Sequence, residues 1–308
     1  MYFPILRGKQ FELSAIRELA ELTSGFSPVI EPVRANSVSL VKTIKTLGEN
    51  KIIPYVIINP SIGDFEEKSP KILQDLDGNK DSSGLFIPCV KIRDASDASA
   101  ISLFESLSGR DAAVFVEDGI DKKLIAAIDG SVCTFVRHNL PDGALSRLKN
   151  IVLYGDFFNK QERNADYGSK SVFSSLHIKY RKYENAIGFG DFTILSEDYS
   201  ESGGPAYVVT IHLSYIDEDE FDSMYVRHFS SFDDASPANP GGKFKDALRK
   251  LVRFSEKNPE LLYDTEGLKE FLELHKQGHF PGLGQVKKVS MKHHIETTCI
   301  YLGEQSNG

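Results

Sequence analysis

Polar side chains recur where short apolar runs end, and these side chains have the clearest capacity for chemistry in the sequence. Four carboxylates are candidate catalytic residues: Glu31, Glu117, Asp156 and Asp191. Six residues are candidate ligand-binding residues, most of them also at the ends of runs: Arg7, Lys9, Asn59, Lys91, Arg137 and His212. Carboxylates bind hard cations or exchange protons, and Arg and Lys bind phosphate. The set therefore favours a site for an anionic ligand.

Three chemistries fit this set, and the residues alone leave all three open. Carboxylates could hold Mg²⁺ or another divalent cation while Arg and Lys hold a phosphate, as in a metal-dependent hydrolase acting on phosphoesters. Two carboxylates could act as acid and base on a sugar. The residues could also bind an anion without turnover. The identity of any metal or other cofactor stays unknown, because no HExxH, GxSxG or Walker-type motif occurs in the sequence.

Eight short apolar runs alternate with helical patterns and predict a parallel sheet, because each parallel crossover needs a helix. The expected strands cover residues 2–6, 27–30, 52–58, 85–92, 112–116, 132–136, 150–155 and 186–190. Eight such units are the number that closes a (β/α)8 TIM-like barrel, which is our predicted α/β fold class. The alternative is an open doubly wound sheet, but no GxGxxG follows any run.

A closed barrel brings the carboxyl ends of its strands to one rim, where barrel enzymes carry their active sites. The candidate residues at the run ends are therefore expected to converge there. Taken singly, each is equally compatible with a strand end exposed to water. His212 lies instead in an alternating segment, "TIHL", where a hydrogen-bonded structural histidine is the commoner outcome.

The pattern changes after the eighth run and predicts three parts. Residues 1–192 form the barrel, with a helix near residues 171–183 that ends the insertion after the seventh run. Residues 193–235 form an antiparallel hairpin packed on the barrel, with the acidic turn "IDEDEFD" between its strands. Residues 236–308 form a helical C-terminal cap.

The formal net charge of −8 disfavours a broad nucleic-acid-coating surface, although a local basic patch leaves nucleic acid open as a partner. Lys245, Arg249 and Arg253 recur every four residues, near Lys243, Lys250 and Lys257. A solvated helix face explains this row, and a docking site for an acidic partner or a phosphate backbone is the alternative.

The cysteines and the apolar runs indicate where the protein resides. Cys89, Cys133 and Cys299 are too far apart for a CxxC metal site, and their odd number argues against a disulfide framework. No apolar run approaches the roughly 18 residues of a spanning helix, so no membrane is expected as a partner. The first ten residues lack a signal-peptide pattern, which predicts a cytoplasmic protein.

The opening "MYFPILRGKQFELSAIRELAE" and the following "FSPVIEPVR" resemble the start of the bacterial and phage beta protein family. The later "GFGDFTI" and "MYVRHFSS" resemble its C-terminal half. The resemblance covers about the first 230 residues and implies a barrel-like fold and a role in anti-phage defence. It also implies a nuclease-like partner encoded nearby, but no established catalytic residues. The matching positions are Arg7, Lys9, Glu12, Glu31, Arg34, Asp191 and His228.

Two hypotheses of function follow. In the first, the chain is a defence protein whose charged rim binds or processes a phosphate-containing or nucleotide-like ligand. In the second, the chain is a non-catalytic sensor or scaffold that binds a partner nuclease. The fold alone does not choose between them, because barrels carry unrelated functions.

Overall fold

The computed structural model describes residues 1–66, 71–201 and 203–307. The chain divides into two compact units. The first contains residues 1–156 and 176–192, and the second contains residues 157–175 and 193–308. Residues 157–175 therefore belong with the C-terminal part of the chain, whereas the sequence placed them in the barrel. The hairpin and the C-terminal helices, which we expected as separate parts, share this second unit.

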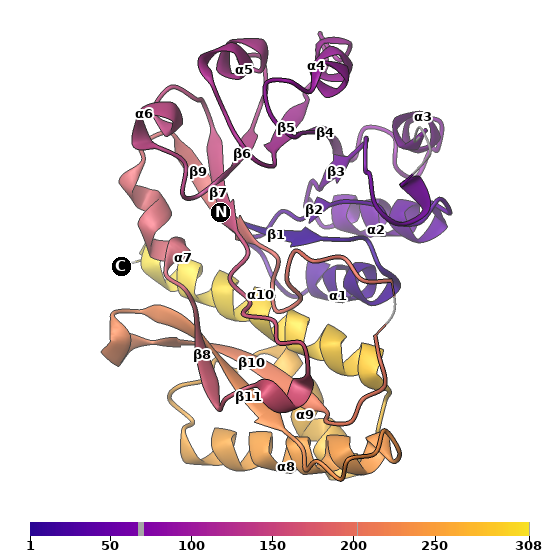
Figure 1. The fold of residues 1–308 in the computed structure, drawn as a ribbon, viewed down its shortest axis with the longest axis vertical. Helices are drawn as coiled ribbons and strands as arrows, with labels where there is room; N and C mark the ends of the chain where they lie inside the picture. Colours follow the sequence, from indigo (N-terminus) through magenta and orange to yellow (C-terminus); the bar gives the residue numbers. More distant parts are fainter. Residues whose placement is uncertain (67–70, 202, 308) are drawn as a thin grey trace. The chain divides into compact units, whose positions relative to one another are not determined.

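The first unit is a closed barrel of eight parallel strands, which confirms the predicted (β/α)8 fold (Figure 1). Neighbours around the barrel follow chain order, and β9 closes it by pairing with both β7 and β1. The barrel strands are β1 (Tyr2–Leu6), β2 (Val29–Ile30), β3 (Tyr55–Ile57), β4 (Ile87–Ile92), β5 (Ala113–Val116), β6 (Thr134–Arg137), β7 (Ile151–Gly155) and β9 (Ala186–Asp191).

Helices follow the strands and cover the barrel with their apolar faces. In α1, for example, Leu13, Ile16 and Leu19 are buried at helical spacing. Asp97 and Asp121 accept backbone N–H bonds at the starts of α4 and α5, which fixes where these helices begin. The helical segments are α1 (Gln10–Ala20), α2 (Val38–Glu49), η1 (Gly63–Phe65), α3 (Ile72–Asp77), α4 (Ala98–Glu105), α5 (Lys122–Ala127), α6 (Asp142–Leu145), α7 (Leu176–Lys179) and η3 (Tyr180–Lys182).

Alternate residues of each strand fill the barrel interior. The interior cluster includes Ile5 and the rings of Phe3, Phe115, Phe135 and Tyr154, which contact one another in edge-on, stacked and tilted pairs. Two glycines of β9 make room for Phe3, since a Cβ added to Gly188 would lie 2.6 Å from the ring of Phe3 and one added to Gly190 would lie 2.5 Å from its carbonyl oxygen. This alternation also decides which polar residues at the strand ends face inward.

The second unit contains a three-stranded antiparallel sheet in the order β10-β11-β8, packed with three helices. The expected hairpin is present, but the start of the helix expected over residues 171–183 is strand β8, which pairs with β11. Only the end of that segment is helical, as α7 and η3 of the first unit. The elements of the second unit are η2 (Asn164–Asp166), β8 (Lys170–Ser174), β10 (Thr210–Asp217), η4 (Glu218–Glu220), β11 (Ser223–Ser230), α8 (Pro240–Lys257), α9 (Glu266–Gln277) and α10 (Leu283–Asn307).

The two faces of this sheet differ in chemistry. Ile211, Leu213 and Phe229 share an apolar core with residues of α8 and α9. The opposite face carries polar residues, of which Ser214 bonds to His294 of α10.

All three cysteines are free and buried, as expected for packing thiols.

Candidate functional site

An ion-paired cluster lies at the carboxyl ends of the first barrel strands. Glu31 follows β2, is 1% exposed, and accepts from Arg7 Nη1 through Oε2. Its other oxygen, Oε1, lies 2.6 Å from Nζ of Lys91, which is only 8% exposed. Both oxygens of this buried carboxylate are therefore occupied by cations, as a buried charge requires.

Lys91 connects this pair to the next strands. Its Nζ also lies 3.1 Å from the hydroxyl of Ser61 and 3.4 Å from Oε1 of Glu117. Arg137 of β6 continues the cluster, because its Nε donates to the backbone carbonyl of Glu117 over 3.0 Å. The sequence-predicted residues Arg7, Glu31, Lys91, Glu117 and Arg137 thus form one connected set.

Aromatic rings from the interior support the two arginines. The guanidinium of Arg7 lies 5.1 Å from the ring centre of Phe192, and that of Arg137 lies 4.7 Å from the ring centre of Tyr154. The hydroxyl of Tyr154 donates to the carbonyl of Val116 over 2.7 Å, which fixes its ring. These cation–π contacts hold both arginines against the top layer of the core.

Asn59 has a structural role in the same cluster. Its side-chain amide donates to the carbonyl of Lys91 over 2.7 Å and accepts from the Lys91 N–H over 2.8 Å. The side chain therefore extends the β3–β4 pairing beyond the end of β3 and orients Lys91. We predicted Asn59 as a ligand-binding residue, and these two bonds make it a positioning residue instead.

The charges of this cluster favour binding an anion. Three of its side chains, Arg7, Lys91 and Arg137, are cations, and the first two contact Glu31, while Lys91 also contacts Glu117. Across residues 1–66, 71–201 and 203–307, no group of three or more His, Cys, Asp or Glu side chains is placed to hold a metal ion.

Asp191 is the clearest departure from the expected rim. Its neighbours across the ladder, Pro4 and Gly155, alternate with the inward-facing residues, so Asp191 faces away from the barrel interior. It is 2% exposed, and its Oδ1 accepts from the hydroxyl of Tyr2 over 2.8 Å. The carboxylate lies in the layer between strands and helices. Phe192 occupies the inward position that we expected for Asp191.

Two further predicted residues, Lys9 and Asp156, lie in the loops that follow β1 and β7. Asp156 follows β7 and is exposed to solvent. Lys9 precedes the first residue of α1 and is half-buried. Gly8, at φ +63°, provides the tight turn between Arg7 and this helix.

Glu12 is a buried acid beside the cluster that the motif match included but the rim argument missed. It is 5% exposed, and its Oε2 accepts from the backbone N–H of Arg7 over 2.5 Å. Burial raises the pKa of Glu12 to about 7, although Lys9 and the Arg7 N–H oppose this shift. Its position three residues after Lys9 in a first helical turn gave no sign of this burial.

His212 belongs to the second unit, where its contacts are with aromatic and imidazole rings. Its Nδ1 lies 2.8 Å from Nδ1 of His228, and Nε2 of His228 lies 2.9 Å from the hydroxyl of Ser171. The rings of Phe158 and Tyr167 pack against His212 at 5.0 and 4.7 Å. Burial, together with His228, lowers the pKa of His212 well below its usual value. The contacts fit the structural alternative better than ligand binding.

The basic row of α8 also differs from its sequence pattern in one member. Lys243 is fully buried, and its Nζ bonds to the carbonyl of Tyr207 over 2.5 Å and to Oδ1 of Asp234 over 2.8 Å. It fastens the segment before α8 and is not part of the exposed face. Lys245, Arg249 and Arg253 are exposed, as the helical spacing indicated.

The fold and the ion-paired rim define a (β/α)8 barrel with a charged mouth. No protein-family model, curated protein or solved structure matches the chain. Within the described residues, no helix combines the length and the apolar character needed to cross a membrane.

Proposed function

We propose that the barrel mouth binds a phosphate-containing or nucleotide-like ligand through Arg7, Lys91 and Arg137. The observation that carries this proposal is the gathering of three basic side chains at the carboxyl ends of the barrel strands, where Arg7 and Lys91 contact Glu31 and Arg137 donates to the carbonyl of Glu117. Arg137 is half-buried, and an anion arriving at the mouth would meet its side chain there.

The same geometry favours binding over acid–base catalysis. A general base needs a carboxylate that is free to take a proton, but both oxygens of Glu31 are held by cations. Glu117 is the more exposed carboxylate, at 33%, and it contacts Lys91. Because cations hold both of these carboxylates, the geometry supports the second candidate, a non-catalytic sensor, over a metal-dependent hydrolase.

We place this ligand-binding protein in cytoplasmic anti-phage defence, with a nuclease-like protein encoded nearby as its partner. The support is the resemblance of "LRGKQFE" and "IEPV" to the beta protein family. Arg7 and Glu31, which form an ion pair, lie in those two motifs. The defence role therefore depends on the same residues as the proposed site.

Calorimetric titration with inorganic phosphate, AMP and ATP tests the ligand class. Arg137→Ala should raise the dissociation constant of the best probe by about 10- to 100-fold, since a hydrogen bond to a charged group contributes about 1.5–3 kcal/mol. The same variant should lose protection in a phage plating assay. Assaying phosphate release with and without Mg²⁺ separates a hydrolase from a sensor.

The matched control is Arg93→Ala. Arg93 directly follows β4, the strand that contains Lys91, but its side chain is 61% exposed and pairs with Asp94. It should leave both binding and protection unchanged. The proposal fails if none of the three probes binds at millimolar concentration, or if Arg93→Ala weakens binding as much as Arg137→Ala does.

A further inference from the structure

The turn between β10 and β11 exposes an aromatic ring among acids. Phe221 is 87% exposed and adopts a left-handed backbone conformation, φ +57°, that directs the chain through the turn. The preceding acids are Asp217, Glu218, Asp219 and Glu220, and none of them forms an ion pair with any described residue. We call residues 217–221 the acidic tip. Exposing a large apolar side chain amid unpaired like charges has no benefit to folding.

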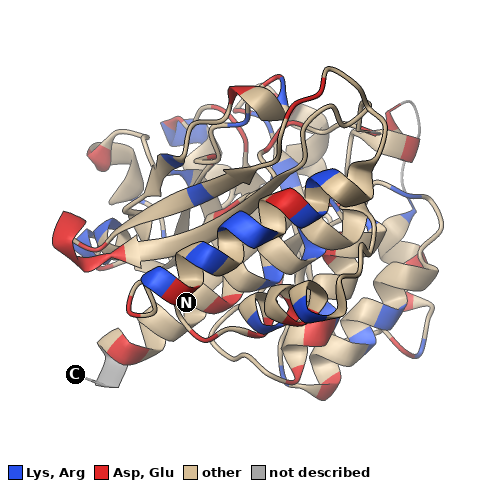
Figure 2. Ribbon diagram, turned by 90° about the horizontal axis from the view of Figure 1, so that it is seen from below, with Lys and Arg blue, Asp and Glu red and all other residues tan. Residues whose placement is uncertain are grey.

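The exposed face of α8 carries the opposite charge. Lys245, Arg249, Arg253 and Lys257 form one row, each a helical turn from the next, and we call them the basic row. Arg249 pairs with Asp246 over 3.3 Å, whereas the other three contact no acidic side chain in the part of the chain that the structure describes. Figure 2 shows this contrast, with blue segments along α8 in front and the red β10–β11 turn at the left edge.

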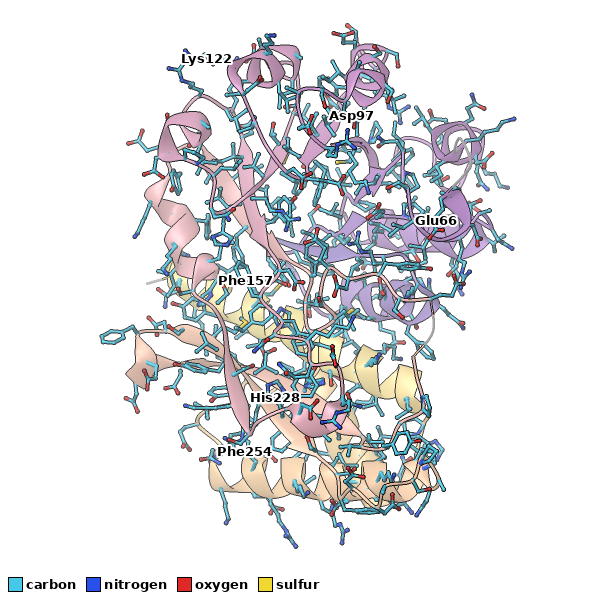
Figure 3. All side chains as sticks on the ribbon, in the orientation of Figure 1. Glu66, Asp97, Lys122, Phe157, His228 and Phe254 are labelled. Atoms are coloured by element: carbon cyan, nitrogen blue, oxygen red, sulfur yellow. The ribbon has the colours of Figure 1, made fainter. Side chains whose placement is uncertain are left out.

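A cavity of about 360 Å³ opens beside the basic row. Its lining includes Arg227, His228 and Ser230 of β11 and Lys250 and Phe254 of α8, of which His228 and Phe254 are labelled in Figure 3. The guanidinium of Arg227 lies 4.9 Å from the ring centre of Phe254. A benzene ring needs roughly 150 Å³, so the cavity can hold a phenylalanine side chain. Its walls offer an aromatic ring and cations, both of which attract aromatic faces.

The tip of one chain does not reach the cavity of the same chain. The tip adjoins Ser223 at the start of β11, and the first residue of that strand to line the cavity is Arg227. Four steps along the strand separate these residues by about 13 Å, and a strand paired on both sides does not fold back. The two complementary surfaces therefore suit two different copies of the chain.

We propose that the protein self-associates head to tail, with Phe221 of one copy inserted in the cavity of the next and its acidic tip against the basic row. Such a contact joins different surfaces of the two copies, so it repeats along a chain of copies or closes into a ring. The four acids of the tip face the four cations of the row, which is the charge complementarity that selects a second copy as the occupant.

Analytical ultracentrifugation at low salt tests the proposal with the full chain. Wild-type protein should gain mass as its concentration rises to about 100 µM, and added salt should reverse the gain. Phe221→Ala should weaken association by about tenfold or more. Two charge reversals, Asp219→Lys/Glu220→Lys in the tip and Arg249→Glu/Arg253→Glu in the row, should each give monomers, with melting temperatures that verify folding.

Mixing the two reversed proteins is the decisive step. One variant then keeps the basic row and the other keeps the acidic tip, while the altered tip and the altered row each carry no net charge. The mixture should therefore associate through one wild-type contact, although neither protein associates alone. Lys122→Glu/Lys123→Glu, a reversal of equal size on exposed α5, should leave association unchanged. A wild-type protein that stays monomeric, or a mixture that stays monomeric, overturns the proposal. So does a monomer whose basic row instead binds a labelled single-stranded oligonucleotide.

Discussion

The barrel mouth and the buried polar network of the second unit solve one problem in different ways. In the mouth, Glu31 and Lys91 are buried as ions and are stabilised by opposite charge over 2.6 Å. In the second unit, where α9, α10 and β10 meet, His293 is fully buried but uncharged. One site keeps charges that a ligand can use, and the other removes charge in favour of packing.

The hydrogen bonds of His293 show why it is neutral. Its Nε2 donates to the carbonyl of Ser214 over 2.7 Å, so its Nδ1 accepts from the hydroxyl of Thr265 over 2.6 Å. The Thr265 oxygen in turn accepts from the N–H of Leu268 and begins α9. Burial lowers the pKa of His293 to about 4, with His294 adding to the effect. Every polar atom of the ring is satisfied without a charge.

Removing one charge from the mouth should have the largest effect on stability. Lys91→Met deletes the cation that contacts both Glu31 and Glu117 and leaves a buried carboxylate with fewer partners. We expect the free energy of unfolding to fall by about 3–5 kcal/mol, measured by urea denaturation. The double variant Glu31→Gln/Lys91→Met should recover most of that loss, because Arg7, at 16% exposure, still reaches water.

Arg93→Met is the control for this comparison, since it removes a cation of the same strand end that is 61% exposed. Its cost should stay below about 1 kcal/mol. If Lys91→Met costs no more than Arg93→Met, the pairing in the mouth contributes little, and the contrast with the second unit is lost.

The sequence was sufficient for the barrel but not for every side chain at its rim. Eight apolar runs with intervening helices gave the closed parallel sheet, because strand number and crossover rules leave few alternatives. The direction of Asp191 depended on strand register, which shifts between Ile151 and Val152 in the β7–β9 pair. A shift of one residue reverses the face of a side chain, and the apolar pattern does not reveal it.

The second unit was less predictable for a related reason. Burial along β8 does not alternate regularly, because its five residues are exposed, half-buried, exposed, buried and half-buried in turn. The composition of the segment also suited a helix. Its pairing with β11 joins residues fifty or more positions apart, and that long-range contact decided its structure. The burial of Lys243 and Glu12 likewise depends on neighbours distant in sequence or in other loops, which residue type alone does not indicate.

The neutral histidine should make the second unit sensitive to acid. The folded pKa of His293, about 4, lies below its usual 6.5, so the unfolded chain binds more protons between these values. Stability is therefore fully present above about pH 6.5 and falls as the pH drops toward 4, by up to about 3 kcal/mol. Hydrogen exchange of α9 and α10 across this pH range measures the loss.

His293→Gln should flatten that pH dependence, since glutamine does not titrate. His275→Gln, on the exposed end of α9, is the matched control and should leave the dependence as in the wild type. An unchanged slope for His293→Gln would mean that another group, such as His228 with its pKa of about 4, accounts for the acid sensitivity.

Glu12 should give a pH dependence of the opposite sign, which sharpens the comparison. Its folded pKa of about 7 lies above the usual 4.5, so the folded state binds more protons between these values, and stability falls as the pH rises through them. Glu12→Gln keeps an oxygen that accepts from the Arg7 N–H but has no charge to bury. We expect a gain of up to about 3 kcal/mol at about pH 8, because the pKa shift is as large as that of His293, and no gain near pH 4, measured by thermal unfolding. Glu21→Gln, at the exposed end of the same helix, should change stability equally little at both pH values. A loss of stability in Glu12→Gln at about pH 8 would show that the ionised carboxylate is stabilised by Arg7 and Lys9, as the mouth stabilises Glu31.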